Sequence, residues 1–131
     1  MKAFNAQLIA EVRANGGKAV SGPFAGREPL LLTTTGAKTF AERTVVVGHA
    51  KYGDAFAIIA SNNGADKMPH WFNNLQANPT ATVELGPEKF RVKARVTEGA
   101  ERAEVAKLID YYERQQALTS REIPIVVLER V

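Results

Sequence analysis

The stretch MPHWFNNLQANPTATVELGPEKFRVKARV, residues 68–96, decides the fold class of this chain. Pro69 suits the first turn of a helix, and Asn78 followed by Pro79 prevents that helix from continuing, so the stretch should open with a short helix. Two β-rich segments follow and are separated only by a Gly-Pro turn. A connection this short suits an antiparallel hairpin and is too short for a parallel crossover.

The rest of the chain adds two helices and four further strands to this prediction. Apolar residues at helical spacing and an Asn-Gly-Gly stop predict a helix over 4–14, and a longer apolar stripe predicts one over about 99–117. The six predicted strands lie at about 29–35, 43–50, 55–61, 80–85, 89–97 and 123–128. Most turns between them are short, so we expect an α+β fold with a mostly antiparallel sheet.

Length and composition limit the classes of function. A chain of 131 residues is the size of one domain, so we expect a single domain over 1–131. The absence of Cys and the presence of only two His argue against a metal site as the centre of its chemistry. The net charge of +3 comes from cations scattered among acidic residues, which favours an anionic small molecule over nucleic acid.

The sequence also bears on location. The first residues carry Glu11 and Arg13 inside their apolar pattern and lack a small-residue cleavage site, so they do not resemble a signal peptide. No run approaches the roughly 18 apolar residues of a membrane-spanning helix. We therefore expect a soluble cytoplasmic protein without a transmembrane segment.

The segment TTTGAKTFAER, residues 33–43, joins a Gly turn to hydroxyls and cations. Backbone N–H groups, Thr hydroxyls, Lys38 and Arg43 could converge on a phosphate, which Arg can bind through two hydrogen bonds. The segment matches neither a Walker loop nor a Gly-rich dinucleotide fingerprint. On residue chemistry alone, a solvated hairpin is the commoner use of such a segment, and both interpretations stay open.

The segment IASNNGADKMPHW, residues 58–71, runs from a strand end through a Gly turn to a helix N-terminus. Backbone groups in such a place can hydrogen-bond a planar heteroaromatic ring. Trp71 could form a wall of that site, and Asn74 could bond the edge of the ring. The alternative is that Trp71 only closes the mouth of the core.

No catalytic arrangement is evident from protein side chains alone. His70 could be a general base, but a single His without a carboxylate at an informative spacing is more often a structural hydrogen-bonding residue. Tyr112 could donate a proton or simply pack. If the chain is an enzyme, we expect its chemistry to reside in a cofactor.

Nearly the whole chain resembles the deazaflavin-dependent nitroreductase and quinone reductase family, which uses coenzyme F420. The resemblance is carried by AEVRANGGK, PLLLTTTGAK, ASNNGADKMPHWFNNLQANPTATVELG and REIPIVVLE. Its most specific part is the element Trp-aromatic-x-Asn-Leu-x-Ala-Asn-Pro, here Trp71 to Pro79. The resemblance implies a split β-barrel, here with six mostly antiparallel strands and flanking helices.

The resemblance also implies a set of site residues. Lys38 and Arg43 match cations that hold the phosphate and acidic tail of the cofactor, while the helix after Met68 and the strand before it flank the deazaflavin ring. The implied cofactor-binding residues are Lys38, Arg43, Val46, Gly48, Ile59, Ser61, Asn62, His70, Trp71 and Asn74, those in the strands through their main chain. The implied catalytic residues are Ser61 and Tyr112.

The chain departs from the family pattern at several of these positions. The family often has Gly-Arg-Lys-Ser-Gly where this chain has Gly36-Ala37-Lys38-Thr39-Phe40, and a Lys that is common after the Ser is Asn62 here. Ala37 and Asn62 both remove positive charge from the expected tail site. Cofactor binding is therefore better supported than any named acceptor.

The implied activity is transfer of a hydride from reduced F420 to a quinone, a nitroaromatic or another activated alkene. Two alternatives stay open: a flavin mononucleotide (FMN) oxidoreductase on the same type of barrel, and a protein that carries a cofactor or lipid without turnover. The expected partner is a small hydrophobic electron acceptor. Peripheral membrane contact and the choice between monomer and homodimer are left open.

Overall fold

The computed structural model describes residues 2–16, 29–60, 68–86, 88–109 and 112–131, and only the backbone of residues 2–6. The elements follow one another as α1 (Lys2–Ala14), β1 (Leu30–Thr35), β2 (Glu42–Val47), β3 (Ala50–Tyr52), β4 (Ala55–Ile59), α2 (His70–Ala77), β5 (Thr80–Leu85), β6 (Glu88–Val96), α3 (Gly99–Ala106), α4 (Tyr112–Gln116) and β7 (Ile125–Arg130). The α+β class is confirmed. None of the described helices is long and apolar enough to cross a membrane.

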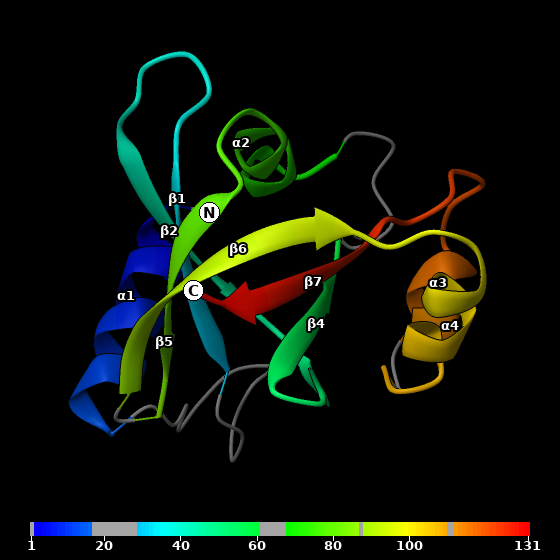
Figure 1. Cartoon of the computed structure of the whole chain (residues 1–131). Coiled ribbons are helices and arrows are strands. Elements are labelled where there is room, and N and C mark those ends of the chain that lie inside the picture. Colours follow the sequence, from blue (N-terminus) through cyan, green and yellow to red (C-terminus); the bar gives the residue numbers. More distant parts are fainter. Residues whose placement is uncertain (1, 17–28, 61–67, 87, 110–111) are drawn as a thin grey trace.

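The described strands form one antiparallel sheet in the order β2-β1-β5-β6-β7-β4-β3 (Figure 1). The expected count of six strands is wrong, because the segment expected as one strand over 43–50 covers most of β2 and the first residue of β3. β2 pairs with β1 and β3 pairs with β4, so the chain passes between the two edge strands of the sheet at Gly48 and His49. Three residue steps cover at most about 11 Å. The two edges therefore come close to each other, and the sheet must be strongly curved.

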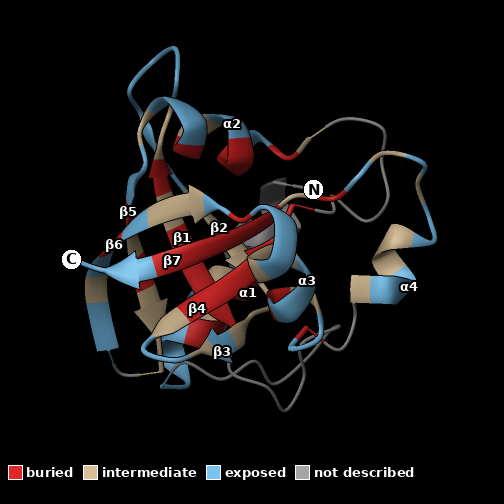
Figure 2. Ribbon diagram, turned by 45° about the vertical axis from the view of Figure 1, so that its right-hand side comes forward, coloured by how far each residue is buried: buried red, intermediate tan, exposed pale blue. Residues whose placement is uncertain are grey.

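The inner face of the curved sheet encloses the largest core. Strands β1, β4, β5, β6 and β7 contribute to it together with α2 (Figure 2). Its buried members are Leu30, Leu32, Phe56, Ile58, Ala60, Trp71, Phe72, Leu75, Ala81, Val83, Val92, Val126 and Leu128. Because successive side chains of a strand point to opposite faces, their neighbours along these strands pack outside the sheet.

Two smaller cores lie on the outer face. Leu31 packs there against Leu8 and Val12 of α1, so the run Leu30–Leu32 is buried on both faces of β1. Ile59 and Val127 pack with α3, in a cluster that also contains Ala57, Val105, Ile109, Ile123 and Ile125. Both faces of β1 and β7 are covered by core residues. This explains why the sequences of these strands contain continuous apolar runs instead of an alternation of apolar and polar residues.

The prediction of one helix over 99–117 is also wrong in its extent, because this stretch contains two helices, α3 and α4. Leu108 donates its N–H to Val105 O at 2.9 Å and Ile109 donates to Ala106 O at 3.3 Å, which are the tighter i to i−3 bonds of a helix end. The turn buries Ile109 in the outer core, whereas Leu108 is 46% exposed. Ile109 is therefore buried against β4 and β7 by a turn after α3, and the predicted apolar stripe does not continue as one helix.

Candidate functional site

The side-chain amide of Asn74 joins α2 to the loop of the β1–β2 hairpin. Its Nδ2 donates to Thr34 Oγ1 at 3.1 Å, and its Oδ1 accepts from the backbone N–H of Ala37 at 3.1 Å. Thr34 is buried, so the first of these bonds lies against the core. Asn74 thereby fixes the loop that carries Lys38 relative to the helix that carries Trp71. Contact between Asn74 and a cofactor ring stays a prediction.

The two predicted phosphate-binding cations lie on this hairpin. Arg43 is paired with Thr34 across the β1–β2 ladder, Lys38 lies in the loop, and both are exposed. Neither side chain forms an ion pair or hydrogen bond with another described residue. Two free cations on an anchored hairpin are suited to an anionic ligand, because none of their charge is neutralised within the described structure.

Phe40 holds an unusual conformation in the same loop. Its φ is 61°, in the left-handed region that favours Gly, and its side chain is 71% exposed. The loop closes through Gly36 N–H to Ala41 O at 2.8 Å and Phe40 N–H to Gly36 O at 3.1 Å. The family that the sequence resembles often has Gly at this position, where the conformation carries no Cβ penalty.

Phe40→Gly is therefore expected to raise the free energy of unfolding by about 0.5 to 1 kcal/mol. The gain is the relief of a left-handed non-Gly residue, about 1 to 2 kcal/mol, less the added entropy of Gly in the unfolded chain, about 0.5 to 1 kcal/mol. Urea unfolding followed by circular dichroism measures the change. Phe40→Ala, which removes the ring and keeps the Cβ, should give no gain. Equal stabilisation by both variants would contradict the backbone explanation.

Trp71 occupies the end of the inner core. It is 7% exposed, and its ring meets that of Phe72 edge-on with the centroids 6.4 Å apart. Together with Leu75, these residues form the buried face of α2. Trp71 is therefore part of the inner core, and both closure of its mouth and a role beside a ring stay predictions. His70 is exposed at the start of α2.

The strand residues of the predicted site offer only their main chain. Val46 packs on the outer core with α1, and Ile59 packs on the outer core with α3, so neither side chain enters the inner core. β2 is an edge strand, and β3 pairs with β4 only over residues 55–57. Within the part of the chain that the structure describes, main-chain groups near Val46, Gly48 and Ile59 thus have no strand partner on one side. Ser61 and Asn62 lie outside the described residues.

The phenol of Tyr112 is held between two side chains. Arg102 Nη2 donates to Tyr112 Oη at 2.8 Å, and Tyr112 Oη lies 3.3 Å from Gln116 Oε1, to which it donates. The Arg102 guanidinium also lies 5.7 Å from the centre of the Tyr112 ring and pairs with Glu122 at 2.9 Å. A phenol with a cation beside its oxygen has a fixed orientation, which suits a proton donor or an orienting group.

Two polar residues of this region were missed from the sequence. Gln116 bonds to the backbone of the segment before β7, and Arg121 Nη1 donates to Ala60 O at the end of β4, at 3.1 Å. The partners of both residues are set by the tertiary fold. The only signal in the sequence is that Arg121 opens REIPIVVLE, one of the stretches that carry the family resemblance.

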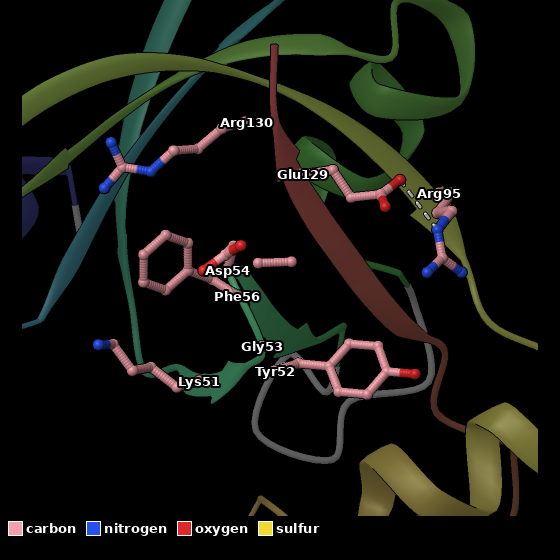
Figure 3. A pocket seen from close by; sticks show the side chains of 9 residues that line it. Lys51, Tyr52, Gly53, Asp54, Phe56, Arg95, Glu129 and Arg130 are labelled. Carbon is pink, nitrogen blue, oxygen red and sulfur yellow. Dashed lines mark hydrogen bonds and ion pairs between the residues drawn. The ribbon is translucent and has the colours of Figure 1, made fainter.

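A separate pocket of about 670 Å³ lies at the β3–β4 turn (Figure 3). Its lining includes Lys51, Phe56 and Arg130, and none of the predicted site residues lines it. Arg95 and Glu129 form an ion pair at one side of it, with Arg95 Nε 3.0 Å from Glu129 Oε1. This pocket is therefore not the predicted cofactor site.

The Arg95 side chain also anchors α3 beside this pocket. It donates two hydrogen bonds to Glu101, and the Tyr52 hydroxyl donates a third at 3.0 Å. The Arg95 guanidinium, and secondarily the Tyr52 hydroxyl, hold the pKa of Glu101 below its ordinary value. The same hydrogen bond to Glu101 raises the pKa of Tyr52. The group ties β3, β6 and α3 together, which is a structural role.

Comparison with known proteins identifies the family. The F420H(2)-dependent quinone reductase family model matches residues 6–130, and the chain belongs to this family. An F420H(2)-dependent quinone reductase of Mycobacterium tuberculosis is 40% identical over 108 residues, which cover 77% of this chain and 72% of the relative. The resemblance stated from the sequence is thereby confirmed.

Two solved structures are similar along most of the chain. One is described as an F420-H2 dependent reductase, with 34% identity, a TM-score of 0.69, and coverage of 77% of this chain and 93% of that structure. The other is described as a domain-swapped dimer, with 30% identity, a TM-score of 0.72, and coverage of 95% and 96%. The family, the Mycobacterium tuberculosis relative and the first of these structures favour F420 and give no support to the FMN alternative. Among the described residues no group of His, Cys, Asp and Glu could hold a metal ion.

Proposed function

We propose that this protein is an F420H2-dependent quinone reductase, which binds the reduced deazaflavin and transfers a hydride to a quinone. The proposal is carried by family membership together with one observation, the free cations Lys38 and Arg43 on a hairpin that Asn74 fixes to α2. A cofactor with a phosphate and an acidic tail requires such cations. A planar ring with a polar edge can bond to main-chain groups, and among the described strands the edge of β2 and residues 58–59 of β4 have no strand partner on one side.

The residues present fit the cofactor, and each has a proposed task. Lys38 and Arg43 hold the anionic tail, the main chain near Val46, Gly48 and Ile59 meets the polar edge of the ring, and α2 excludes water from one side. His70, Ser61 and Asn62 remain proposed contacts. When bound, reduced F420 supplies the hydride. The quinone also takes up a proton to become the hydroquinone, and Tyr112, oriented by Arg102, holds or delivers that proton, with Ser61 as a further candidate.

Several finer points belong to the same proposal. The near approach of the edge strands at Gly48 and His49 supports a split β-barrel. The structural relative described as a domain-swapped dimer supports a homodimer, which light scattering after size-exclusion chromatography would test. A single domain over 1–131, a cytoplasmic location, nitroaromatic acceptors and peripheral membrane contact stay predictions.

A titration with F420 and FMN tests the function directly. Quenching of Trp71, the only Trp in the chain, reports binding of either compound. We expect F420 to bind and FMN to bind more weakly, and reduced F420 to be oxidised when menadione is added under anaerobic conditions. Binding of F420 without turnover of any quinone would favour the non-catalytic carrier. Tighter binding of FMN would overturn the proposal.

Tyr112→Phe is expected to lower kcat with menadione roughly tenfold or more, with little change in F420 affinity. The substitution removes the hydroxyl that Arg102 and Gln116 hold, and general acid catalysis typically contributes more than this factor. Steady-state rates and binding titrations measure the two effects separately. Tyr52→Phe is the matched control, because Tyr52 bonds to Glu101 in the other polar group. An unchanged kcat for Tyr112→Phe would remove Tyr112 as a proton donor.

A further inference from the structure

One guanidinium contacts both flanks of the segment between β4 and α2. Arg121 Nη1 donates to Ala60 O at 3.1 Å and lies 3.3 Å from Met68 Sδ. Ala60 follows the last residue of β4, and Met68 precedes the Pro69 that caps α2. Ala60 is fully buried, so its carbonyl needs a partner within the protein. Arg121 therefore fixes the end of β4 and the start of α2 at a defined separation.

The segment that carries Arg121 is itself held in place. Gln116 Nε2 donates to Arg121 O at 2.7 Å, and Gln116 Oε1 accepts from the Ile123 N–H at 3.0 Å. Next to it, Ala60 N–H donates to Pro124 O at 3.0 Å. Backbone and side-chain bonds thus join the loop before β7 to the end of β4 at two adjacent points. These bonds hold the backbone of Arg121 beside the end of β4.

The same contacts lead to the acceptor side of the proposed site. Tyr112 Oη lies 3.3 Å from the Gln116 oxygen that also accepts from Ile123. Tyr112 is therefore connected through Gln116 to the backbone of Arg121, whose guanidinium donates to the Ala60 carbonyl. A displacement of Arg121 would therefore change the contacts both at the end of β4 and beside the Tyr112 phenol.

We propose that Arg121 is a positioning residue for hydride transfer. It sets the separation between the end of β4 and the start of α2, the two elements that flank the ring in the proposed function, on which this inference rests. Arg121 acts through Ala60 and Met68, without contact with the reacting atoms. Small errors in such a separation are costly, since a misplacement of about 1 Å can lower a rate about a hundredfold.

Arg121→Gln tests the proposal both without the cofactor and with it. Trp71 lies at the start of α2, just after the residues that Arg121 holds. In the variant without cofactor, its fluorescence should therefore be quenched by acrylamide more readily than in the wild type. In the presence of F420, the Kd should rise about tenfold, because part of the binding free energy must then be spent on ordering the start of α2 against the end of β4. The kcat with menadione should fall by at least as much, while KM for menadione changes less.

Arg114→Gln is the matched control, because Arg114 is an exposed Arg of α4 and loses the same charge. It should leave quenching, Kd and kcat at wild-type values. Arg121→Lys keeps a charged donor without the planar guanidinium and should give intermediate values. If Arg121→Gln does not fold, the Lys variant decides the matter. Wild-type Trp71 quenching and wild-type Kd in the folded variant would overturn the proposal, even if its thermal stability falls.

The two readouts separate this inference from the function on which it rests. If the wild-type protein does not bind F420, the proposed function fails, whereas the acrylamide measurement still reports whether Arg121 holds α2. If wild-type binds F420 and Arg121→Gln changes neither readout, only the positioning role is overturned. The double variant Gln116→Ala/Arg121→Gln should raise log Kd for F420 by less than the sum of the increases in the two single variants. The reason is that both residues act on the same loop.

Discussion

Replacement of Trp71 by Ala is expected to lower the free energy of unfolding by about 3 to 5 kcal/mol and to weaken F420 binding as well. The indole is 7% exposed at the end of the inner core, so its loss leaves a cavity next to Phe72 and Leu75. The same indole is the proposed wall of the ring site. Urea unfolding followed by circular dichroism gives the first effect, and calorimetric titration with F420 gives the second, since the variant lacks the only Trp.

Trp71→Phe serves as the control because it keeps an aromatic ring in the core. It should recover most of the lost stability and part of the lost affinity. A folded Trp71→Ala protein that binds F420 as tightly as the wild type would show that Trp71 only fills the core. The ring would then have to lie elsewhere than beside α2.

Removal of both hairpin cations is expected to have the largest effect on cofactor affinity. At low salt Lys38→Ala and Arg43→Ala should each raise the Kd for F420 about tenfold or more, as expected for a charge-assisted contact of about 1.5 to 3 kcal/mol. Salt screens such contacts and lowers their contribution toward the 0 to about 1 kcal/mol of an exposed ion pair, so the differences should shrink at high ionic strength. Titrations of both single variants and the double variant at two salt concentrations measure this.

Lys51→Ala supplies the control for non-specific charge effects. Lys51 is an exposed cation of the separate pocket at the β3–β4 turn, so its loss should leave the Kd nearly unchanged. The affinity for FMN should fall less than that for F420 in the Lys38 and Arg43 variants, because FMN lacks the acidic tail beyond its phosphate. If neither hairpin variant changes the Kd for F420 at low salt, the hairpin is only a solvated loop and the tail binds elsewhere.

The sequence was sufficient for most local elements of the fold. Proline positions placed α2 correctly, because Pro69 caps it and Asn78 ends it as expected from backbone restrictions. The division between β2 and β3 was not predictable in this way. Residues 43–50 are β-rich throughout, and only the pairing of each half with a different strand shows that the chain changes its place in the sheet.

The candidate site was predicted in its residue types more than in its contacts. The cations Lys38 and Arg43 lie on the expected hairpin, whereas the amide of Asn74 bonds to Thr34 and Ala37, far away in the sequence. Arg121 likewise reaches Ala60 and Met68, which no local pattern indicates. Helical or strand periodicity reports which face of an element is buried, and it carries no information about partners on other elements.

The central place of β7 in the sheet has a consequence for the kinetics of folding. Of the described strands, β7 comes last in the sequence, yet it lies between β6 and β4 and joins the β3–β4 hairpin to the rest of the sheet. Until residues 125–130 have been synthesised, that hairpin can pair only with itself, and a two-stranded hairpin is marginally stable in water. Closing the loop between Ile59 and Ile125 also costs chain entropy before any strand contact is gained. We therefore expect refolding to be limited by docking of β7, with a high relative contact order and rates in the millisecond to second range typical of sheet proteins.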